Sequence, residues 1–529
     1  MHLKPLGHLS RAAHKPSFAL PPPDPAITVP SVPLPAETDV AIVGAGFGGL
    51  GMAIRLKQAG RDDFVVLERA AGVGGTWWAN TYPGCQCDIP SNLYSFSFAR
   101  KSDWTTAYPL REQILDYLND CARRFGVGPH TQLECELLDA SWVPERGRWE
   151  IETSTGRLAA RVLVAAPGLL SEPCVPALPG LERFEGTTFH TASWDHDHDL
   201  TGRRVAVLGT GATAIQVVPS IRERVGRLFV FQRTPPWVIP HLDHPVGPRL
   251  QRLYERAPAL QRLVRATVWG LHEVLVPGMT RDPRLLKGHE LLARANLYRG
   301  VRDRELRRRL TPDYAFGCKR VLLSDDWYPA IASPDVELVT SGIREVREGS
   351  IVDGDGVEHE LDTIVFATGF VPSDPPIARR LRAGDGRTLS QVWRGSPKAY
   401  LGTTVSGFPN LFLLYGPNTN LGHSSIVYML ESQVTYVMSA LDTMDAHGAA
   451  AAELRAAVQE AFDAEIQERL QHSIWNSGCS SWYLDGNGRN AIQWPGFTFE
   501  FRRRTRRFEA ADYRLTPPVP APEAAPALG

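Results

Sequence analysis

The chain has 529 residues, 43% of them hydrophobic and 22% charged, which is the composition of an ordinary globular protein. A single hydrophobic core does not support a chain of this length, so we expect roughly two to four domains. The formal net charge of −1 gives no electrostatic reason to expect nucleic acid or anionic lipid as a partner.

The apolar runs and the cysteines bear on the cellular compartment. No run of about 18 apolar residues is present, so we expect no membrane span. The N-terminus lacks the charged and apolar regions of a secretory signal. The cysteines are odd in number and scattered, which argues against a disulfide framework and favours a reducing, cytoplasmic location. The seven cysteines are Cys85, Cys87, Cys121, Cys135, Cys174, Cys318 and Cys479.

The first patterned stretch, TDVAIVGAGFGGLGMAIRLKQAG, predicts a strand, a glycine turn and a helix. The apolar strand is followed by Gly44, Gly46 and Gly49 in G-x-G-x-x-G spacing. These glycines permit a tight turn, close approach of the backbone to a pyrophosphate, and close packing of helix on strand. A second strand ends at Glu68, 24 residues after Gly44, where a carboxylate can accept hydrogen bonds from a ribose. This pattern predicts a site for FAD or NAD.

The stretch RRVAVLGTGATAIQVVPSI repeats the pattern. Its motif positions are Gly209, Thr210, Gly211 and Ala214. The next strand, LFVFQR, ends at Arg233, again 24 residues after the first glycine. A guanidinium can bind a 2′-phosphate through two parallel hydrogen bonds, and the hydroxyl of Thr234 could donate one more to the same phosphate. The second site is therefore predicted to hold NADPH, although Arg233 taken alone is also typical of a solvated strand end.

Two dinucleotide sites in one chain suggest that electrons pass from a nicotinamide to a flavin. Residues 163–168 and 364–370 support this interpretation, because each is an apolar strand closed by a small-residue turn. Such turns are expected to bring the chain back against the first dinucleotide domain. Each segment taken alone also fits an ordinary strand and turn.

Two longer motifs resemble those of the Baeyer–Villiger monooxygenases, which are class B flavoprotein monooxygenases. RFEGTTFHTASWD fits the pattern F-x-G-x-x-x-H-x-x-x-W-(P/D), and GGTWWANTYPGCQCD fits (A/G)-G-x-W-x-x-x-x-(F/Y)-P-(G/M)-x-x-x-D. The matching residues are Phe184, Gly186, His190, Trp194 and Asp195 in the first motif, and Gly74, Gly75, Trp77, Tyr82, Pro83, Gly84 and Asp88 in the second. The resemblance extends from about residue 37 to about residue 515.

The resemblance implies an α/β fold with two dinucleotide-binding, Rossmann-like domains, one for FAD and one for NADP. A helical insertion in the NADP domain is expected at about 241–311, rich in Leu and Arg, as a wall of the substrate pocket. The expected division is a Pro-rich extended tail (1–36), the first part of the FAD-binding domain (37–180), a fingerprint linker (181–195), the NADP-binding domain (196–365), the second part of the FAD-binding domain with a C-terminal closing segment (366–515), and a Pro/Ala-rich tail (516–529).

The stretch FGCKRVLLSDDWYPA resembles the family's active-site segment. That resemblance places a catalytic arginine at Arg320 and a contact to the 2′-phosphate of NADP(H) at Lys319. Asp88 is the expected partner of Arg320, because a carboxylate bonded to guanidinium orients the fork. A surface basic pair at 319–320 and a capping role for Asp88 are the alternative interpretations.

The remaining expected site residues surround the flavin or join the domains. Gly75, Thr76 and Trp77 would line the isoalloxazine and its ribityl chain, and Tyr94 matches a flavin-contacting position. One of Trp77 and Trp78 could equally be core filler. His190, with Trp194, is assigned a conformational role between the domains, and a purely structural His190 is an open alternative.

The pair Cys85 and Cys87 has the wrong spacing for a flavin-linked disulfide reductase. No His or Cys partners suggest zinc, so no metal is expected and the two cysteines are interpreted as packing residues.

The resemblance implies an FAD-dependent, NADPH- and O₂-consuming enzyme. It would insert one oxygen atom next to a ketone carbonyl through a C4a-peroxyflavin, giving an ester or lactone. A flavin monooxygenase acting on nitrogen or sulfur is one alternative, and a non-catalytic protein on a dinucleotide-binding scaffold is another. The expected partners are a small ketone and O₂, with no nucleic acid and no protein partner evident.

Overall fold

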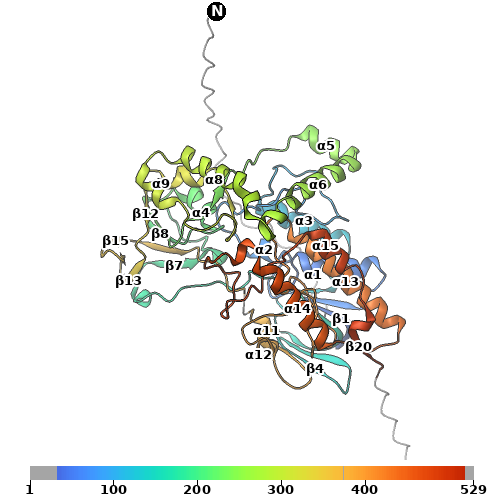
Figure 1. Ribbon diagram of the computed structural model, residues 1–529. Coiled ribbons are helices and arrows are strands. Elements are labelled where there is room, and N and C mark those ends of the chain that lie inside the picture. The colour runs from blue at the N-terminus through green and yellow to red at the C-terminus, as the bar shows by residue number, and fades with distance from the viewer. Residues whose placement is uncertain (1–32, 373–374, 519–529) are drawn as a thin grey trace, which may run out of the picture.

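The structure is a computed structural model that describes residues 33–372 and 375–518. The tails expected at 1–36 and 516–529 lie almost entirely outside this range. Two sheets organise the described chain, the first at the lower right of Figure 1 and the second at the left, with helices between and around them. The predicted α/β class with two dinucleotide-binding sheets is confirmed.

The first sheet is built around β1, whose second half, residues 40–43, is apolar. β1 is parallel to β2 on one side and to β6 on the other, so the carboxyl ends of all three strands meet at one edge. β4, β5 and β6 form an antiparallel meander, and β18 also pairs with β6. In spatial order the strands are β17 (Leu381–Arg382), β4 (Leu137–Val143), β5 (Arg148–Thr153), β6 (Gly156–Ala165), β1 (Glu37–Val43), β2 (Phe64–Leu67) and β3 (Thr131–Gln132), with β18 (Leu411–Leu413) off this path.

Helices from both ends of the chain cover this sheet. The long helix α13 packs against α1, so the C-terminal part of the chain supports the first glycine turn. β19 (Ala451–Leu454) and β20 (Tyr513–Thr516) form a separate antiparallel pair. The helices associated with the first sheet are α1 (Phe47–Gln58), α2 (Thr76–Ala79), α3 (Arg111–Arg124), α11 (Ile377–Arg380), α12 (Leu389–Trp393), α13 (Ile426–Ala446), α14 (Ala456–Gln471) and α15 (Thr498–Arg504).

The second sheet is entirely parallel, and its three central strands, β9, β8 and β16, are largely buried apolar runs, as expected where both faces are covered. In spatial order it contains β12 (Val336–Val339), β9 (Arg227–Phe231), β8 (Arg204–Leu208), β16 (Thr363–Phe366) and β7 (Thr187–His190). The helices α4 (Ala214–Ile221) and α10 (Trp327–Ile331) pack together beside it, and a small antiparallel sheet of β13 (Ile343–Arg347), β14 (Ser350–Asp353) and β15 (Glu358–Glu360) follows β12.

Five helices interrupt the second domain between β9 and β12. They are α5 (Pro248–Arg256), α6 (Pro258–Glu273), α7 (Val276–Thr280), α8 (Lys287–Gly300) and α9 (Arg304–Leu310). We call residues 248–310 the helical insertion. It forms the upper part of the molecule in Figure 1, away from the first sheet. The short parallel strands β10 (Val238–Ile239) and β11 (Leu322–Leu323) flank it.

The segment expected as a linker at 181–195 is partly a strand. Residues Thr187–His190 form β7 at the edge of the second sheet, parallel to β16. A four-residue edge strand next to a motif of glycine and aromatic residues leaves little periodicity to recognise in the sequence. The interpretation of residues 181–195 as the connection between the two domains stays a prediction.

The chain crosses between the two sheets twice, and the two crossings are hydrogen-bonded to each other. The amide of Cys174 donates to the carbonyl of Gly369 (2.8 Å), and the amide of Val371 donates to the carbonyl of Glu172 (3.0 Å). Pro173 and Phe370 form an antiparallel bridge between these bonds. The crossings thus form a short two-stranded ribbon, which we call the crossing ribbon.

The cysteines differ from the expectation in one respect. Cys318 and Cys479 form a disulfide across 161 residues of chain, with their Cα atoms 6.4 Å apart. The remaining described cysteines are free, and four of these five are buried. Two cysteines so distant in sequence give no local signal of pairing, so the expectation of unpaired thiols is wrong for this pair. Among the described residues, no helix is both long and apolar enough to cross a bilayer.

Candidate functional site

The first glycine turn is closed so tightly that side chains are excluded. Gly44 has a φ of +97°, and a Cβ placed there would overlap the carbonyl oxygen of Ala166. A Cβ at Gly49 would overlap the carbonyl oxygen of Gly44. The N-terminus of α1 begins after Gly46 with no side-chain cap, so its amides are open to an anion. The turn after β6, predicted at 163–168, thus packs on the first motif.

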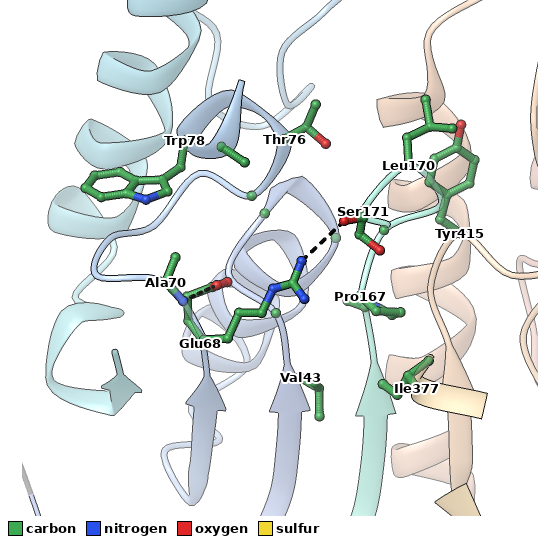
Figure 2. Close-up of a pocket in the computed structure, with 18 of the residues that line it drawn as sticks. Val43, Glu68, Ala70, Thr76, Trp78, Pro167, Leu170, Ser171, Ile377 and Tyr415 are labelled. Carbon is green, nitrogen blue, oxygen red and sulfur yellow. Dashed lines mark hydrogen bonds between the residues drawn. The ribbon is translucent and has the colours of Figure 1, made fainter. Parts of the chain in front are cut away.

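A cavity of about 640 Å³ opens above this turn, at the carboxyl edge of the first sheet (Figure 2). Glu68 lies on its floor, where one carboxylate oxygen accepts from the amide of Ala45 (2.7 Å) and the other from that of Ala70 (2.8 Å). These bonds fix the carboxylate, and each oxygen keeps a further lone pair for a ribose hydroxyl. The cavity size is that of a site for a large cofactor.

The expected flavin-lining residues border the same cavity. Gly75, Thr76, Trp77 and Tyr94 all line it. A Cβ at Gly75 would lie 2.9 Å from the Cα of Gly46, so this segment rests directly on the glycine turn. The indole nitrogen of Trp77 donates to the hydroxyl of Tyr94 (3.2 Å). Figure 2 shows Trp78 and Thr76 above Glu68, with Tyr415 across the cavity from it. The carboxylate of Glu68, the open amides of the glycine turn and the aromatic side chains that border the cavity together fit FAD.

The second glycine turn has the same construction with one open position. Gly209 has a φ of +112°, and a Cβ there would lie 2.5 Å from the carbonyl oxygen of Ala367. The turn at 364–370 therefore packs on the second motif rather than the first, and only its end reaches the first domain through the crossing ribbon. A Cβ at Gly211 would meet nothing within 4 Å. This open position leaves room for a pyrophosphate beside α4, whose first residue is Ala214.

Two cations, Arg233 and Lys319, lie beside the second turn. Thr210 donates to the carbonyl of Thr234 (3.0 Å) and so ties the turn to the residue after Arg233. The pKa of Lys319 is lowered, first by burial and then by the nearby charge of Arg233. Neither cation forms an ion pair with a described residue, and Lys319 instead lies over the ring of Tyr314 at 4.8 Å. A pair of unneutralised cations fits the 2′-phosphate of NADPH.

Arg320 and Asp88 are paired although 232 residues separate them. The Nε of Arg320 donates to Oδ2 of Asp88 at 3.0 Å, and Nη2 donates to the same oxygen. The charge of Asp88 raises the pKa of Arg320 above its ordinary value. The guanidinium therefore stays charged, and its Nη1 takes no part in the pair. Asp88 serves this arginine rather than capping the segment that follows it.

Two tyrosines that the sequence did not single out lie near this pair. Burial raises the pKa of Tyr483 to about 12 and raises that of Tyr415, while the charge of Arg320 acts in the opposite direction on both. Both phenols therefore stay protonated at neutral pH. Tyr415 has a φ of +63° and donates to the side-chain oxygen of Asn420 (2.6 Å). Left-handed backbone at a bulky residue is often a mark of a functional loop, but it is invisible in the sequence.

The C-terminal segment at 478–496 lies on the 418–422 loop. The amide of Asn420 donates to the carbonyl of Ile492 (3.0 Å), and that of Trp494 donates to the carbonyl of Asn420 (2.9 Å). The Cys318–Cys479 disulfide joins this segment to the residue two positions before Arg320. The segment is thus bound to the chain that carries the arginine.

His190 lies at the boundary between the two domains. It ends β7 of the second sheet, while the following Ala192 and Ser193 line the first cavity. Its Nδ1 accepts from the amide of Ala192 (3.0 Å), and burial lowers the pKa of His190, so the ring is neutral. Trp194 packs edge-to-face on Phe189 with ring centroids 5.0 Å apart. This placement supports a conformational role for His190.

Cys85 and Cys87 are buried free thiols, as expected for packing residues. Burial raises the pKa of Cys85 to about 12 and that of Cys87 well above its ordinary value. Both therefore remain protonated and unreactive.

Comparisons with known proteins agree along almost the whole chain. The family described as "Pyridine nucleotide-disulphide oxidoreductase" matches residues 41–256. A Baeyer-Villiger monooxygenase of Streptomyces coelicolor is 49% identical over 91% of this chain and 93% of its own, and one of Pseudomonas aeruginosa is 46% identical over 92% and 93%. Among solved structures, a steroid monooxygenase bound to NADP superposes with a TM-score of 0.81 (31% identity, 91% of this chain and 99% of that one). A closed crystal structure of a cyclohexanone monooxygenase superposes with a TM-score of 0.82. It is 29% identical, and the match covers 92% of this chain and 100% of that one.

Proposed function

Because this chain belongs to the Baeyer–Villiger monooxygenase family, we propose that Arg320 and Asp88 form the catalytic centre of an FAD- and NADPH-dependent enzyme that inserts one oxygen atom next to a ketone carbonyl. The observation that carries the assignment is the pairing of these two residues near the partly buried Tyr415 and the buried Tyr483. A charged, oriented guanidinium that is only partly exposed is the group needed where negative charge develops on oxygen.

FAD fits the first cavity and NADPH the second glycine turn. Glu68 would bind the adenosine ribose, the amides of the first turn the pyrophosphate, and residues 75–77 with Tyr94 the ring system. Arg233 and Lys319 would bind the 2′-phosphate of NADPH. When bound, the two groups supply reducing equivalents and the site at which O₂ is activated.

The chain's own contribution is electrostatic and positional. Asp88 holds Nε and Nη2 of Arg320, which aims the remaining N–H groups of the fork toward the reacting oxygen. The same guanidinium would then stabilise the negative oxygen of the tetrahedral adduct formed from the ketone. Tyr415 and Tyr483 stay protonated and, with the C-terminal segment, exclude water from the centre.

The substrate class and location are proposed with the reaction. The substrate is a small ketone, oxidised with O₂ to an ester or lactone. A cytoplasmic location is supported by the five free described cysteines. Whether the Cys318–Cys479 disulfide is oxidised or reduced would then depend on the redox state of that compartment.

Replacing Arg320 by Ala tests this assignment. The variant should bind FAD and accept hydride from NADPH, yet ester formation should fall by about 10²–10³-fold, because one oxyanion-stabilising group is lost. The measurement compares NADPH consumption with ester production, identified by mass, over a panel of ketones. Arg347→Ala, which removes a surface arginine paired with Glu345, is the matched control. Wild-type ester yield from Arg320→Ala would contradict the proposal.

A further inference from the structure

The outer side of the helical insertion is unusually apolar. Nine of the fifteen large hydrophobic side chains that are exposed in the described chain belong to residues 248–310. Leu263, Leu271 and Val274 on and just after α6 are 64–71% exposed, and their spacing places them within about 80° of each other around the helix. Leu285 and Leu291, beyond α7, are also exposed. We call Leu263, Leu271 and Val274 the apolar face. Large exposed apolar side chains gathered on one side of a helix mark a candidate interaction site.

The same region carries a large excess of positive charge. Residues 248–310 contain fifteen lysines and arginines against six aspartates and glutamates, in a chain whose net charge is −1. Nine of these cations are exposed and form no ion pair with any described residue. They are Arg249, Arg252, Arg256, Arg262, Arg281, Arg284, Lys287, Arg302 and Arg304. Arg262 precedes Leu263 in sequence and so lies about 100° from it around α6, at the border of the apolar face. Arg284 precedes the exposed Leu285.

The inner side of the insertion contacts the candidate active centre. Leu286, next to the exposed Leu285, is buried, and its Cδ1 lies 3.5 Å from where a Cβ on Gly317 would be. The sulfur of Met279 lies 3.5 Å from the corresponding position at Gly422. Gly317 precedes Arg320 by three residues, and Gly422 belongs to the loop beside the C-terminal segment. The helical insertion therefore both packs on segments next to Arg320 and exposes apolar side chains.

We propose that the apolar face and its surrounding cations bind the surface of an anionic lipid bilayer. Leucine side chains would enter the boundary between headgroups and acyl chains, and the unpaired arginines would contact the phosphates. The charge distribution favours this partner over a second copy of the chain. A symmetric dimer through this face would bring two sets of unneutralised cations together, which opposes association. The insertion would lie on the membrane and would not cross it.

Vesicle flotation of the purified FAD-loaded enzyme tests the proposal. Binding to vesicles with about one-third phosphatidylglycerol should exceed binding to pure phosphatidylcholine by roughly tenfold, and should weaken as salt rises. Leu263→Gln with Leu271→Gln and Val274→Gln should lower binding to the anionic vesicles by roughly tenfold. The control pair Val175→Gln and Val357→Gln, whose valines are 51% and 53% exposed elsewhere, should bind like wild type.

A charge series separates the electrostatic contribution. Replacing Arg262, Arg281 and Arg284 by Gln should abolish the preference for anionic vesicles. The control replaces three exposed arginines outside the helical insertion by Gln and should keep the preference for anionic vesicles. They are Arg183, Arg203 and Arg344. FAD content, thermal midpoint and NADPH oxidation in solution should be unchanged in every variant, which excludes misfolding.

Three results would overturn the proposal. The first is no difference between anionic and neutral vesicles. The second is equal loss of binding in the leucine set and the valine controls. The third is self-association in solution, measured by light scattering and removed by the leucine set, without vesicle binding. That last result would assign the apolar face to a second copy of the chain.

Discussion

At the scale of single residues, we propose that Arg233 and Lys319 determine which nicotinamide coenzyme suits the second site. Arg233 follows β9, and after burial its charge is the next cause that lowers the pKa of Lys319, while the charge of Asp313 raises that pKa. Two cations held near each other repel. A 2′-phosphate removes that repulsion and is bound by both, whereas a bare ribose offers neither effect.

Arg233→Ala should therefore lose selectivity for NADPH. We expect the KM for NADPH to rise by about tenfold or more, while the KM for NADH stays close to the wild-type value. Steady-state kinetics with both coenzymes provide the measurement. Arg227→Ala, at the other end of β9 and paired with Glu337, is the control and should leave the ratio unchanged. An unaltered preference in Arg233→Ala would remove Arg233 from the phosphate site.

At the scale of elements, the two strand–turn–helix units use their glycines for different reasons. Gly209 has no space for a side chain because the turn after β16 lies against it, whereas Gly211 faces open space. The fold therefore requires glycine at position 209, whereas at position 211 we expect the ligand to require it. Replacing each glycine by alanine distinguishes these two requirements.

Gly209→Ala should destabilise the second domain, because its φ of +112° and the contact with Ala367 both disfavour a Cβ. Gly211→Ala should fold with a wild-type thermal midpoint but bind NADPH at least tenfold more weakly, because the methyl group occupies the approach to the pyrophosphate. Calorimetry and coenzyme titration distinguish the outcomes. Equal stability loss in both variants would show that Gly211 also serves the fold.

The elements differ in how far the sequence predicts them. Glu68 and Arg233 stand at the same offset from their glycines, so local pattern alone places them at the two cofactor turns. Arg320 and Asp88 are far apart in the chain, and only the family resemblance connects them. Strand β7 escaped prediction because four edge residues show no periodicity. Tyr415 escaped because a left-handed backbone at a tyrosine depends on tertiary packing.

At the scale of the whole molecule, properties that sum over the chain conceal local structure. The net charge of −1 predicted no affinity for anionic surfaces, yet residues 248–310 carry fifteen basic against six acidic residues. A total does not record position, so acidic residues elsewhere in the chain hide the excess of positive charge in residues 248–310. The Cys318–Cys479 pair was missed for a related reason, since pairing depends on spatial proximity.

Removing that disulfide should loosen the C-terminal segment over Arg320. The chain-entropy model for a loop of 161 residues gives a loss of about 5 kcal/mol in the free energy of unfolding. We expect Cys318→Ser with Cys479→Ser to lower the thermal midpoint and to speed proteolysis within residues 473–496. The control is Cys121→Ser, which alters a buried free thiol. Identical proteolysis rates with and without reductant would show that the disulfide does not restrain the segment.

The crossing ribbon has a mechanical consequence. A single connecting chain lets two bodies turn about any axis, because each backbone dihedral is free to rotate. Two connections that are hydrogen-bonded side by side, as at Glu172–Val371 and Cys174–Gly369, share their torsions and cannot lengthen separately. Such a ribbon bends readily only out of its own plane. We therefore expect the two sheets to rotate relative to each other mainly about one axis, set by the crossing ribbon. His190, at the end of β7, would move together with the second sheet.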